Sequence, residues 1–485
     1  MTKARAVAAA GTAALMVGAA SAAGAALRDP HRRKRVERSA RVWWLTTRRS
    51  AHWATVKVRG VGADEARKAE LEQRFAIRSA EDVAAALGNM KGAIMKLGQL
   101  VSFIAEGLPP EAQQALASLQ ADVEPMAPSL AEQVVRDELG DDPDHVFLDW
   151  SPVPVAAASV GQVHRAVLHD GRIVAVKVQY PGVGRAIMSD LDNAEVLYSM
   201  ASAISLKGLD VKGFVDELRL RMGEELDYRR EAANQAEFAA LYRDHPFIHV
   251  PEVVPEHSAE RVITTEWADG LTWSQFETTA SPAVKQRAGE VLFRFAQGSV
   301  HRHGVFNGDP HPGNYRFHAD GSITFLDFGL VKRWSPGEWE RLSPCLDAIL
   351  DRQPDRLVDA MVESRFLPEG HGLTPEAVFE YVSAPYVPYL TERFTFSRSF
   401  TADALSKVFD VNGPSAEVIR KLNMPPSFVI LDRVVWGVSA LLGKLGAEGP
   451  WRGILAEYRY GGPPATELGR QDAEWRAGFG RGAGR

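Results

Sequence analysis

The chain has 485 residues, which is too long for one compact core, so two domains or one large bilobed domain is expected. It is 45% hydrophobic and 24% charged, and this composition excludes both a disordered chain and a polytopic membrane protein. The single cysteine, Cys345, excludes an internal disulfide and a cysteine-cluster metal site, and it favours a reducing compartment. The net charge is −6, but the first 50 residues carry eleven lysines and arginines against Asp29 and Glu37. The rest of the chain is therefore acidic and a poor nucleic-acid binder.

Residues 6–27 form an uncharged segment of mostly alanine and glycine, and seven basic residues follow it between positions 28 and 41. Its length permits a membrane span, although alanine and glycine are only marginally apolar on insertion scales. Small residues near its end also fit a secretory signal, and an alanine-rich leader without a membrane role is the third possibility. The basic run argues against translocation, so we expect association with the cytoplasmic face of a membrane.

The hydrophobic pattern then changes along the chain. Three- and four-residue spacing over 64–119 predicts helices. Two β-rich runs, 163–168 and 173–178, flank Asp170-Gly171 and predict a hairpin. A helical stretch at 184–242 and strands at 252–254 and 261–266 follow, and the remainder is mainly helical with a second hairpin near Asp320-Gly321.

Two late segments have distinct predictions. Phe428–Leu445 is apolar but contains Asp432 and Arg433, which indicates a buried helix and not a membrane span. Residues 461–485 are rich in glycine and arginine and are predicted to form a loose tail.

The strongest chemical signal is the run from Asn307 to Asn314, which contains Asp309. Asp309 and Asn314 have the spacing of the aspartate and asparagine in a kinase catalytic loop. The predicted second hairpin leads from this loop into Asp327-Phe328-Gly329. The order of these motifs places three oxygen-bearing side chains near one phosphate, and Mg²⁺ prefers such hard ligands.

A second signal lies upstream, where Lys177 ends the run Val174-Ala-Val-Lys177. A lysine at the end of that strand can reach a phosphate as a point charge. The preceding loop stands where a kinase places its glycine-rich phosphate loop, but it is alanine-rich, which narrows the accessible backbone conformations. Its candidate nucleotide-binding residues are Ala156, Ala157, Ala158, Ser159, Val160, Gly161 and Gln162.

Together these motifs resemble the AarF/UbiB family of atypical kinases. Lys96-Leu-Gly-Gln99 resembles the Lys-x-Gly-Gln signature of that family, and Glu225-Leu-Asp227 resembles its Glu-x-Asp signature. The resemblance covers about residues 85–450, with six motifs in the family's order.

The resemblance implies a role for each matched residue. Lys177 contacts phosphate with Glu231 as its partner on a neighbouring helix, and Asp309 stands at the position of the catalytic base. Asn314 and Asp327 hold Mg²⁺. Lys96 and Gln99 belong to a helical extension that covers the substrate cleft and faces Glu225 and Asp227, a regulatory pairing that spacing alone does not show. The segment Glu266, Trp267 and Ala268 stands where a hinge binds adenine.

The expected fold is α+β, a bilobed protein-kinase-like fold with an N-terminal helical extension and a mainly helical C-terminal lobe. The expected parts are residues 1–50 as apolar and basic leader, 51–149 as helical extension, 150–270 as small lobe, 271–460 as large lobe and 461–485 as tail.

Two further patterns narrow the chemistry. His301, His303 and His311 lack metal-ligand geometry, since the first two point to different sides of a helix and the third lies in a proline-rich turn. Ser335 and Glu338 form a capping box that starts a helix soon after Gly329, which leaves no room for the activation segment that seats a peptide.

We therefore expect Mg²⁺-dependent ATP binding, with hydrolysis or phosphoryl transfer to a small or lipid-like substrate at a membrane surface. The family resemblance suggests a place in isoprenoid-quinone or other lipid metabolism. Three alternatives remain: an ordinary protein kinase, a small-molecule kinase of the aminoglycoside or choline type, and a catalytically silent nucleotide-binding scaffold. The absent activation segment disfavours the first, Lys96 to Gln99 and the alanine-rich loop disfavour the second, and the intact charged residues count against the third.

Overall fold

The structure is a computed structural model that describes residues 126–158, 160–184, 223, 226–409, 413–423 and 426–482. The leader 1–50, with its apolar segment 6–27, and most of the predicted extension 51–149 lie outside the described residues. Ser159, Lys96, Gln99 and Glu225 lie outside them as well. Within the described part of the chain, no helix is both long enough and apolar enough to span a membrane.

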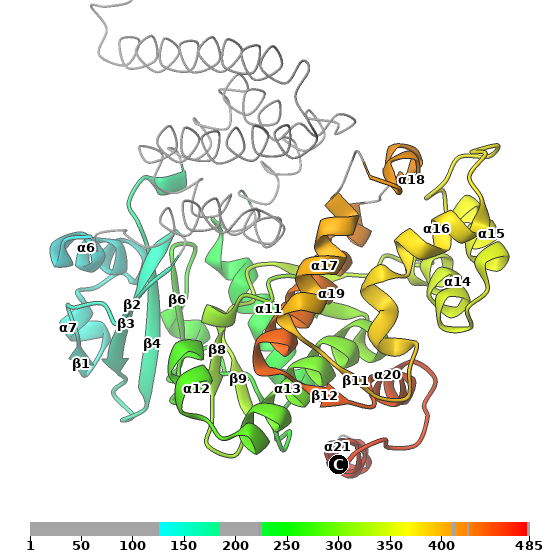
Figure 1. The fold of residues 1–485 in the computed structure, drawn as a ribbon. Coiled ribbons are helices and arrows are strands. Elements are labelled where there is room, and N and C mark those ends of the chain that lie inside the picture. Colours follow the sequence, from blue (N-terminus) through cyan, green and yellow to red (C-terminus); the bar gives the residue numbers. More distant parts are fainter. Residues whose placement is uncertain are drawn as a thin grey trace, which may run out of the picture. The chain divides into compact units, whose positions relative to one another are not determined.

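The first described part is built on a five-stranded antiparallel sheet, shown in cyan to green in Figure 1. The strand order is β1-β3-β4-β6, and β2 also pairs with β3. The predicted hairpin is confirmed, because its turn residue Gly171 has φ of 89° and Asp170 Oδ1 accepts from Arg172 N at 3.0 Å. The strands are β1 (Asp149–Trp150), β2 (Ala156–Ala157), β3 (Gly161–Val167), β4 (Ile173–Gln179) and β6 (Val262–Glu266).

The two faces of this sheet have different coverings. Helices α6 (Pro128–Leu139) and α7 (Pro143–Val146) pack on one face, where Val174, Val176 and Val178 of β4 are fully buried. Alternation along β4 turns Lys177 to the opposite face. Helix α11 (Tyr228–Leu241) contributes Glu231 to that side of the sheet, against Lys177.

The described chain outside this sheet contains smaller sheets of two or three short strands. β8 (Tyr315–Phe317) and β9 (Ile323–Phe325) form the predicted second hairpin, and β5 (Ile248–His249) pairs with β9 in parallel. β7 (Val305–Asn307) pairs with β10 (Val331–Arg333), and β11 (Phe394–Thr395) pairs with β12 (Glu448–Gly449). The predicted strand at 252–254 is wrong, because only a single bridge, Val253 to Thr265, forms there.

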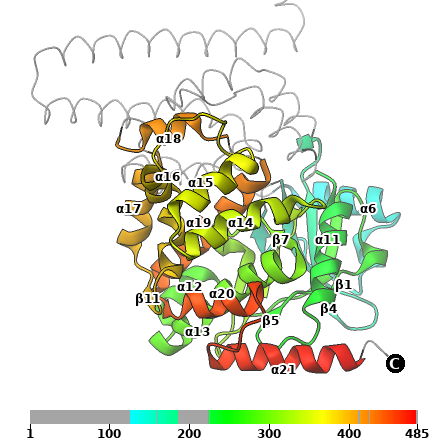
Figure 2. The same ribbon diagram turned by 90° about the vertical axis from the view of Figure 1, so that its right-hand side faces the viewer.

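Apart from these strands and the connecting loops, the described chain after β6 is helical (Figures 1 and 2). The α-helices are α12 (Trp273–Thr279), α13 (Pro282–Gln297), α14 (Glu338–Leu350), α15 (Pro354–Glu363), α16 (Pro375–Val382), α17 (Arg398–Phe409), α18 (Ala416–Lys421), α19 (Pro426–Leu445), α20 (Trp451–Arg459) and α21 (Glu467–Gly482). The shorter helices are η1 (Pro255–His257), η3 (Pro312–Asn314) and η4 (Ala384–Tyr389), all 3-10, and the π-helix η2 (Gly298–His303).

Helix α19 is the buried helix that the sequence predicts. Leu431, Val434 and Leu442 are among its residues that pack in the main apolar cluster, together with Phe293 and Ala296 of α13.

The predicted capping box before α14 is confirmed in part. The Ser335 amide donates to Glu338 Oε2 at 2.8 Å, but the helix begins only at Glu338, with Gly337 as its N-cap at φ of 74°. Strand β10 occupies part of the interval after Gly329, so the chain returns at once to β7. The predicted loose tail is wrong, because α21 is a helix of 16 residues that Figure 2 shows along the lower edge.

Candidate active site

Lys177 and Glu231 meet on the face of the sheet that is opposite α6 and α7. Lys177 Nζ lies 2.8 Å from Glu231 Oε1 and 2.9 Å from Oε2, and 3.4 Å from Asp327 Oδ2. Burial disfavours the charged lysine, but Asp327 and Glu231 outweigh this and hold the pKa of Lys177 well above its ordinary value. Lys177 is therefore a fixed cation beside two carboxylates.

Asp309 and Asn314 are brought together by two strand pairings. The β7–β10 pair holds the start of the loop, where Gly308 N donates to Leu330 O at 2.7 Å. The β8–β9 hairpin holds its end, where Leu326 N donates to Asn314 O at 2.9 Å. Within the loop, Asn314 Nδ2 donates to Asp309 Oδ2 at 3.0 Å. The loop is thus closed on itself and fixed next to Asp327.

Asn307 is a site residue that the motif spacing did not reveal. Its Nδ2 donates to Asp327 O at 2.6 Å, and its Oδ1 accepts from Asp309 N at 2.9 Å. One amide therefore ties the loop of the candidate base to the loop of the candidate metal ligand. Its signal in the sequence was a polar residue at the end of an apolar strand, directly before the motif.

Asp327 is oriented by its own turn. Its Oδ1 accepts from Gly329 N at 2.9 Å, while Oδ2 faces Lys177. Phe328 is fully buried, and its carbonyl accepts from Asn234 Nδ2 of α11 at 3.0 Å. Helix α11 thus contacts both the lysine and the Asp-Phe-Gly turn.

Asn314 and Asp327 have a donor set that fits Mg²⁺. The amide nitrogen of Asn314 is engaged by Asp309, so its Oδ1 is the atom left for a cation. A carboxylate and an amide oxygen are the hard ligands that Mg²⁺ takes, usually with water and substrate phosphates completing the shell.

The strand register places small and apolar residues beside Lys177, and the sequence analysis did not identify them. Val163 of β3 and Ile263 of β6 lie directly opposite Lys177, and Ala175 lies opposite Thr265. Residues paired in this way share a face of an antiparallel sheet. Small and apolar side chains therefore line the sheet beside Lys177, where a flat base can stack.

The predicted hinge follows β6. The amides of Glu266 and Trp267 donate to Glu252 O at 2.9 Å and Ile173 O at 3.1 Å. Of the three predicted residues, Ala268 is the one whose N–H no described residue engages. Adenine contact at this segment would therefore use the Ala268 amide.

Most of the alanine-rich loop is engaged in the sheet. Ala156 and Ala157 form β2 on the edge of β3, and Ala158 N donates to Gly161 O at 2.8 Å. The side chain of Gln162 faces the other side of the sheet, where its Oε1 accepts from Met126 N at 3.0 Å. The backbones of these residues are engaged as well, because Gln162 lies in β3 between β2 and β4 and Val160 O accepts from Tyr180 N at 2.9 Å.

Of the four predicted regulatory residues, the structure describes one, Asp227. Asp227 is the N-cap of α11, and its Oδ1 accepts from Arg229 N at 3.1 Å. Lys96, Gln99 and Glu225 lie outside the described residues, so their pairing with Asp227 stays a prediction.

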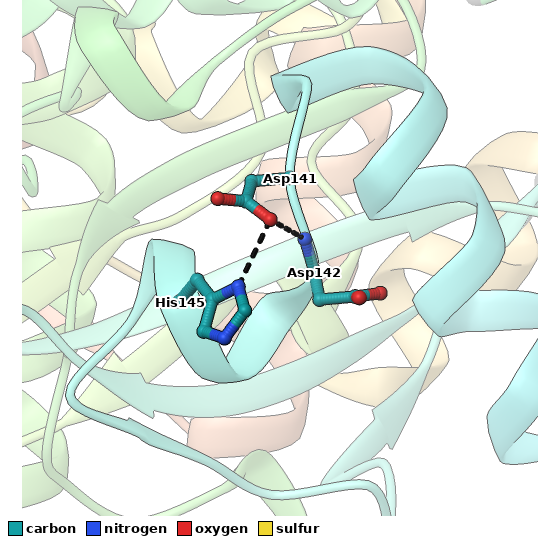
Figure 3. Close-up of side chains that lie close together, drawn as sticks. All are labelled: Asp141, Asp142 and His145. Carbon is teal, nitrogen blue, oxygen red and sulfur yellow. Dashed lines mark hydrogen bonds and ion pairs between the residues drawn. The ribbon is translucent and has the colours of Figure 1, made fainter.

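A separate exposed group, Asp141, Asp142 and His145, brings metal-type ligands together. Asp141 Oδ1 accepts from Asp142 N at 2.8 Å and lies 3.0 Å from His145 Nδ1, while the Asp142 carboxylate points away from both (Figure 3). Asp142 instead binds Arg136. The group is thus an exposed ion-pair cluster beside α7, remote in sequence from Asp309 and Asp327.

Comparisons with known proteins identify the family of this chain. Residues 118–361 match the model of the ABC1 atypical kinase-like domain. The mitochondrial atypical kinase COQ8B of Rattus norvegicus is 30% identical over 72% of this chain and 65% of its own length. A chloroplast aarF domain-containing protein kinase of Arabidopsis thaliana is 34% identical over 81% of this chain and 56% of its own length. The chain thus spans somewhat over half of these two relatives.

A solved structure shows the same fold. The protein Rv3197 of Mycobacterium tuberculosis, solved in complex with erythromycin, has a TM-score of 0.59 and 31% sequence identity. The match covers 81% of this chain and 98% of that one. The α+β kinase-like fold expected from the motifs is therefore confirmed.

Proposed function

Since this chain belongs to the ABC1 atypical kinase-like family, we propose that it binds ATP with Mg²⁺ and transfers the terminal phosphoryl group to a small or lipid-like acceptor or to water. The observation that carries the proposal is the chain of contacts that brings Lys177, Glu231, Asp309, Asn314 and Asp327 together, with Asn307 linking the loops of Asp309 and Asp327.

Each side chain has a task in this reaction. Lys177, held by Glu231, positions the phosphates of the nucleotide, and Asn314 with Asp327 would hold Mg²⁺, which neutralises phosphate charge. Asp309 lies in the loop that closes on Asn314, where it can accept the proton of an attacking hydroxyl. Catalysis is then positioning and charge stabilisation, as phosphoryl transfer requires.

Two observations favour a non-protein acceptor. The chain after Gly329 returns through β10 to β7 and enters α14 at Glu338, so residues 330–337 offer no extended platform for a peptide. The Mycobacterium tuberculosis relative is described with erythromycin, a large and largely apolar small molecule. We therefore include erythromycin among the ligands to test, beside isoprenoid-like and quinone-like compounds.

We further propose that the protein works at the cytoplasmic face of a membrane, in isoprenoid-quinone or other lipid metabolism. The support is the basic segment at 28–41 and the relative COQ8B, an atypical kinase of mitochondria. Anionic lipid attracts such basic segments at about 1 kcal/mol per residue close to the surface.

The test is MgATP turnover by the full chain with and without anionic liposomes, with Asp327→Ala as the blank. We expect turnover that rises with liposomes and disappears in the blank. Clear MgATP binding without turnover, under every lipid and acceptor tried, would leave a nucleotide-binding scaffold and refute the enzyme.

A further inference from the structure

Helix α19 lies directly against the loop that carries Asp309. A Cβ on Gly437 would overlap with Pro310, and one on Gly308 would lie 2.7 Å from Ile430 Cγ2. Positions 430, 433 and 437 recur on one face of a helix. Arg433, between the two contacts, therefore points at the same loop.

Arg433 binds the candidate base. Its Nη2 donates to Asp309 Oδ1, and the two side chains are only 11% and 5% exposed. The other oxygen, Asp309 Oδ2, accepts from Asn314. No lysine or arginine stands between Asp309 and Asn314 in the loop, so α19 supplies the cation that the loop lacks.

The second terminal nitrogen of Arg433 has a different status. Arg433 Nη1 is buried, and among the described residues it has no hydrogen-bond partner. Leaving a buried charged N–H unpaired is energetically unfavourable. A guanidinium with one nitrogen on a carboxylate and the other unsatisfied is suited to a second oxyanion, because its donors form a rigid fork.

In the proposed reaction, the oxyanion that comes close to Arg433 is the transferred phosphoryl group. The acceptor oxygen gives its proton to Asp309 and bonds to the terminal phosphorus, while the bond from phosphorus to the bridging oxygen breaks and ADP leaves. The reacting phosphoryl group must therefore pass next to Asp309, with negative charge spread over its outer oxygens.

We propose that Arg433 is the transfer-step arginine of this protein: Nη2 positions Asp309, and Nη1 donates to an outer oxygen of the transferred phosphoryl group. This rests on the proposed function and assigns to α19, 124 residues after the loop, a direct part in catalysis. Arginines that play this role within one chain raise phosphoryl-transfer rates by roughly three orders of magnitude or more.

The first experiment measures binding instead of turnover, with the full chain. MgADP and MgADP with fluoroaluminate, which mimics the phosphoryl group in transfer, are titrated into wild type, Arg433→Gln and Arg433→Lys. We expect wild type to bind the fluoroaluminate complex more tightly than MgADP alone. Both variants should lose that preference by roughly 100-fold while keeping the MgADP affinity, since one transition-state donor is worth about that factor.

The second experiment is chemical rescue. Turnover of Arg433→Ala should fall by roughly 100-fold or more and return in part when guanidinium at millimolar concentration fills the vacated space. Arg393→Gln, which removes an exposed arginine paired with Glu448, is the matched control and should behave as wild type. A thermal unfolding curve for each variant separates lost catalysis from lost folding.

The outcomes separate the two levels of the proposal. Equal affinity of wild type for MgADP and its fluoroaluminate complex, or an unchanged preference in Arg433→Gln, would overturn the role of Arg433 and leave nucleotide binding standing. Absence of MgADP binding in the wild type would overturn both the proposed function and the proposed role of Arg433.

Discussion

Lys177 of β4 and Glu231 of α11 form a bidentate ion pair, with both carboxylate oxygens within 2.9 Å of the same ammonium. Their side chains are 15% and 6% exposed, so the pair is shielded from solvent. Because Glu231 lies on α11, this contact fixes the helix against the sheet before any nucleotide is bound. The cleft is therefore preorganised for phosphate on this side.

Replacing Glu231 by glutamine should weaken nucleotide binding. The change keeps the shape of the side chain but removes one of the two charges that hold Lys177 in place. We expect MgATP affinity to fall about tenfold, which corresponds to about 1.4 kcal/mol. Titration of a fluorescent ATP analogue against the full chain measures it.

Glu237→Gln is the matched control for this prediction. Glu237 lies on the same helix and binds Arg333, but that pair is 39% and 50% exposed. Exposed ion pairs contribute about 0–1 kcal/mol, so the control should bind MgATP like wild type. Equal affinity losses in the two variants would mean that α11 acts as a whole and that the Lys177 contact is not specific.

Replacing Gly437 by alanine should separate α19 from the catalytic loop. The added Cβ would overlap with Pro310, so the helix or the loop must shift. We expect turnover to fall by at least tenfold, since misplacing a reacting group by about 1 Å can cost a hundredfold in rate. MgATP affinity should change little, because Lys177 and the sheet are untouched.

The control for this substitution is Gly478→Ala on α21, where a Cβ would meet nothing within 4 Å. Alanine is better than glycine inside a helix by about 1 kcal/mol, so this variant should be as stable as wild type or slightly more so. Unchanged turnover in Gly437→Ala would show that the loop does not depend on the close approach of α19.

Local sequence patterns predict one part of the site. Asp309, Asn314 and Asp327 lie within one loop and one hairpin, so their order and spacing nearly determine their meeting. Lys177 and Glu231 come together over 54 residues, and for these the family resemblance supplied the pairing.

Arg433 was out of reach of such reasoning. Its approach to Asp309 depends on how α19 packs, and a charged residue in an apolar stretch indicates only that some partner exists. The C-terminal helix was missed for another reason. Glycine and arginine content predicted a loose tail, although Leu468, Asp472 and Trp475 recur at helical spacing and form the face that packs.

Asp472 anchors that helix, and its removal should destabilise the fold. Burial alone would raise the pKa of Asp472, but hydrogen bonds from His245 and Arg302 outweigh it and hold the pKa well below its usual range. Asp472→Asn leaves Arg302 without its buried carboxylate, which costs about 3 kcal/mol in comparable pairs. Urea unfolding measures the loss.

Glu474→Gln removes an exposed carboxylate two residues away on the same helix and should change the free energy of unfolding by less than about 0.5 kcal/mol. If Asp472→Asn is no less stable than this control, α21 is held by its apolar contacts alone. The test then shifts to Trp475, whose Nε1 donates to Arg243 O at 3.0 Å.

The π-helix before the catalytic loop should make stability depend on pH. His301 and His303 are partly buried, and burial lowers the pKa of His301 from 6.5 to about 3 and that of His303 from 6.5 to about 4. Arg459 and Arg302 add to these shifts. Both histidines are thus neutral in the folded protein at neutral pH.

The sign follows from the lowered pKa values. Below pH 6.5 the unfolded chain takes up protons that the folded protein refuses, so stability is full above pH 6.5 and falls as pH drops toward 4 and then 3. Each histidine contributes a slope of about 1.4 kcal/mol per pH unit in this window. The ring of His301 lies 5.0 Å from that of Trp339, and His301→Phe keeps an aromatic ring there but removes the titrating group.

We therefore expect the loss of unfolding free energy between pH 7.5 and 5.5 to be about 1 kcal/mol smaller in His301→Phe than in wild type. His303→Phe should reduce the same loss by a similar amount, and the double variant by about the sum, because the two rings contact different partners, Trp339 and Tyr242. Urea unfolding at the two pH values, followed by tryptophan fluorescence, supplies all four numbers. An identical loss in wild type and both single variants would show that these histidines become protonated without unfolding the helix, and that acid sensitivity arises elsewhere in the fold.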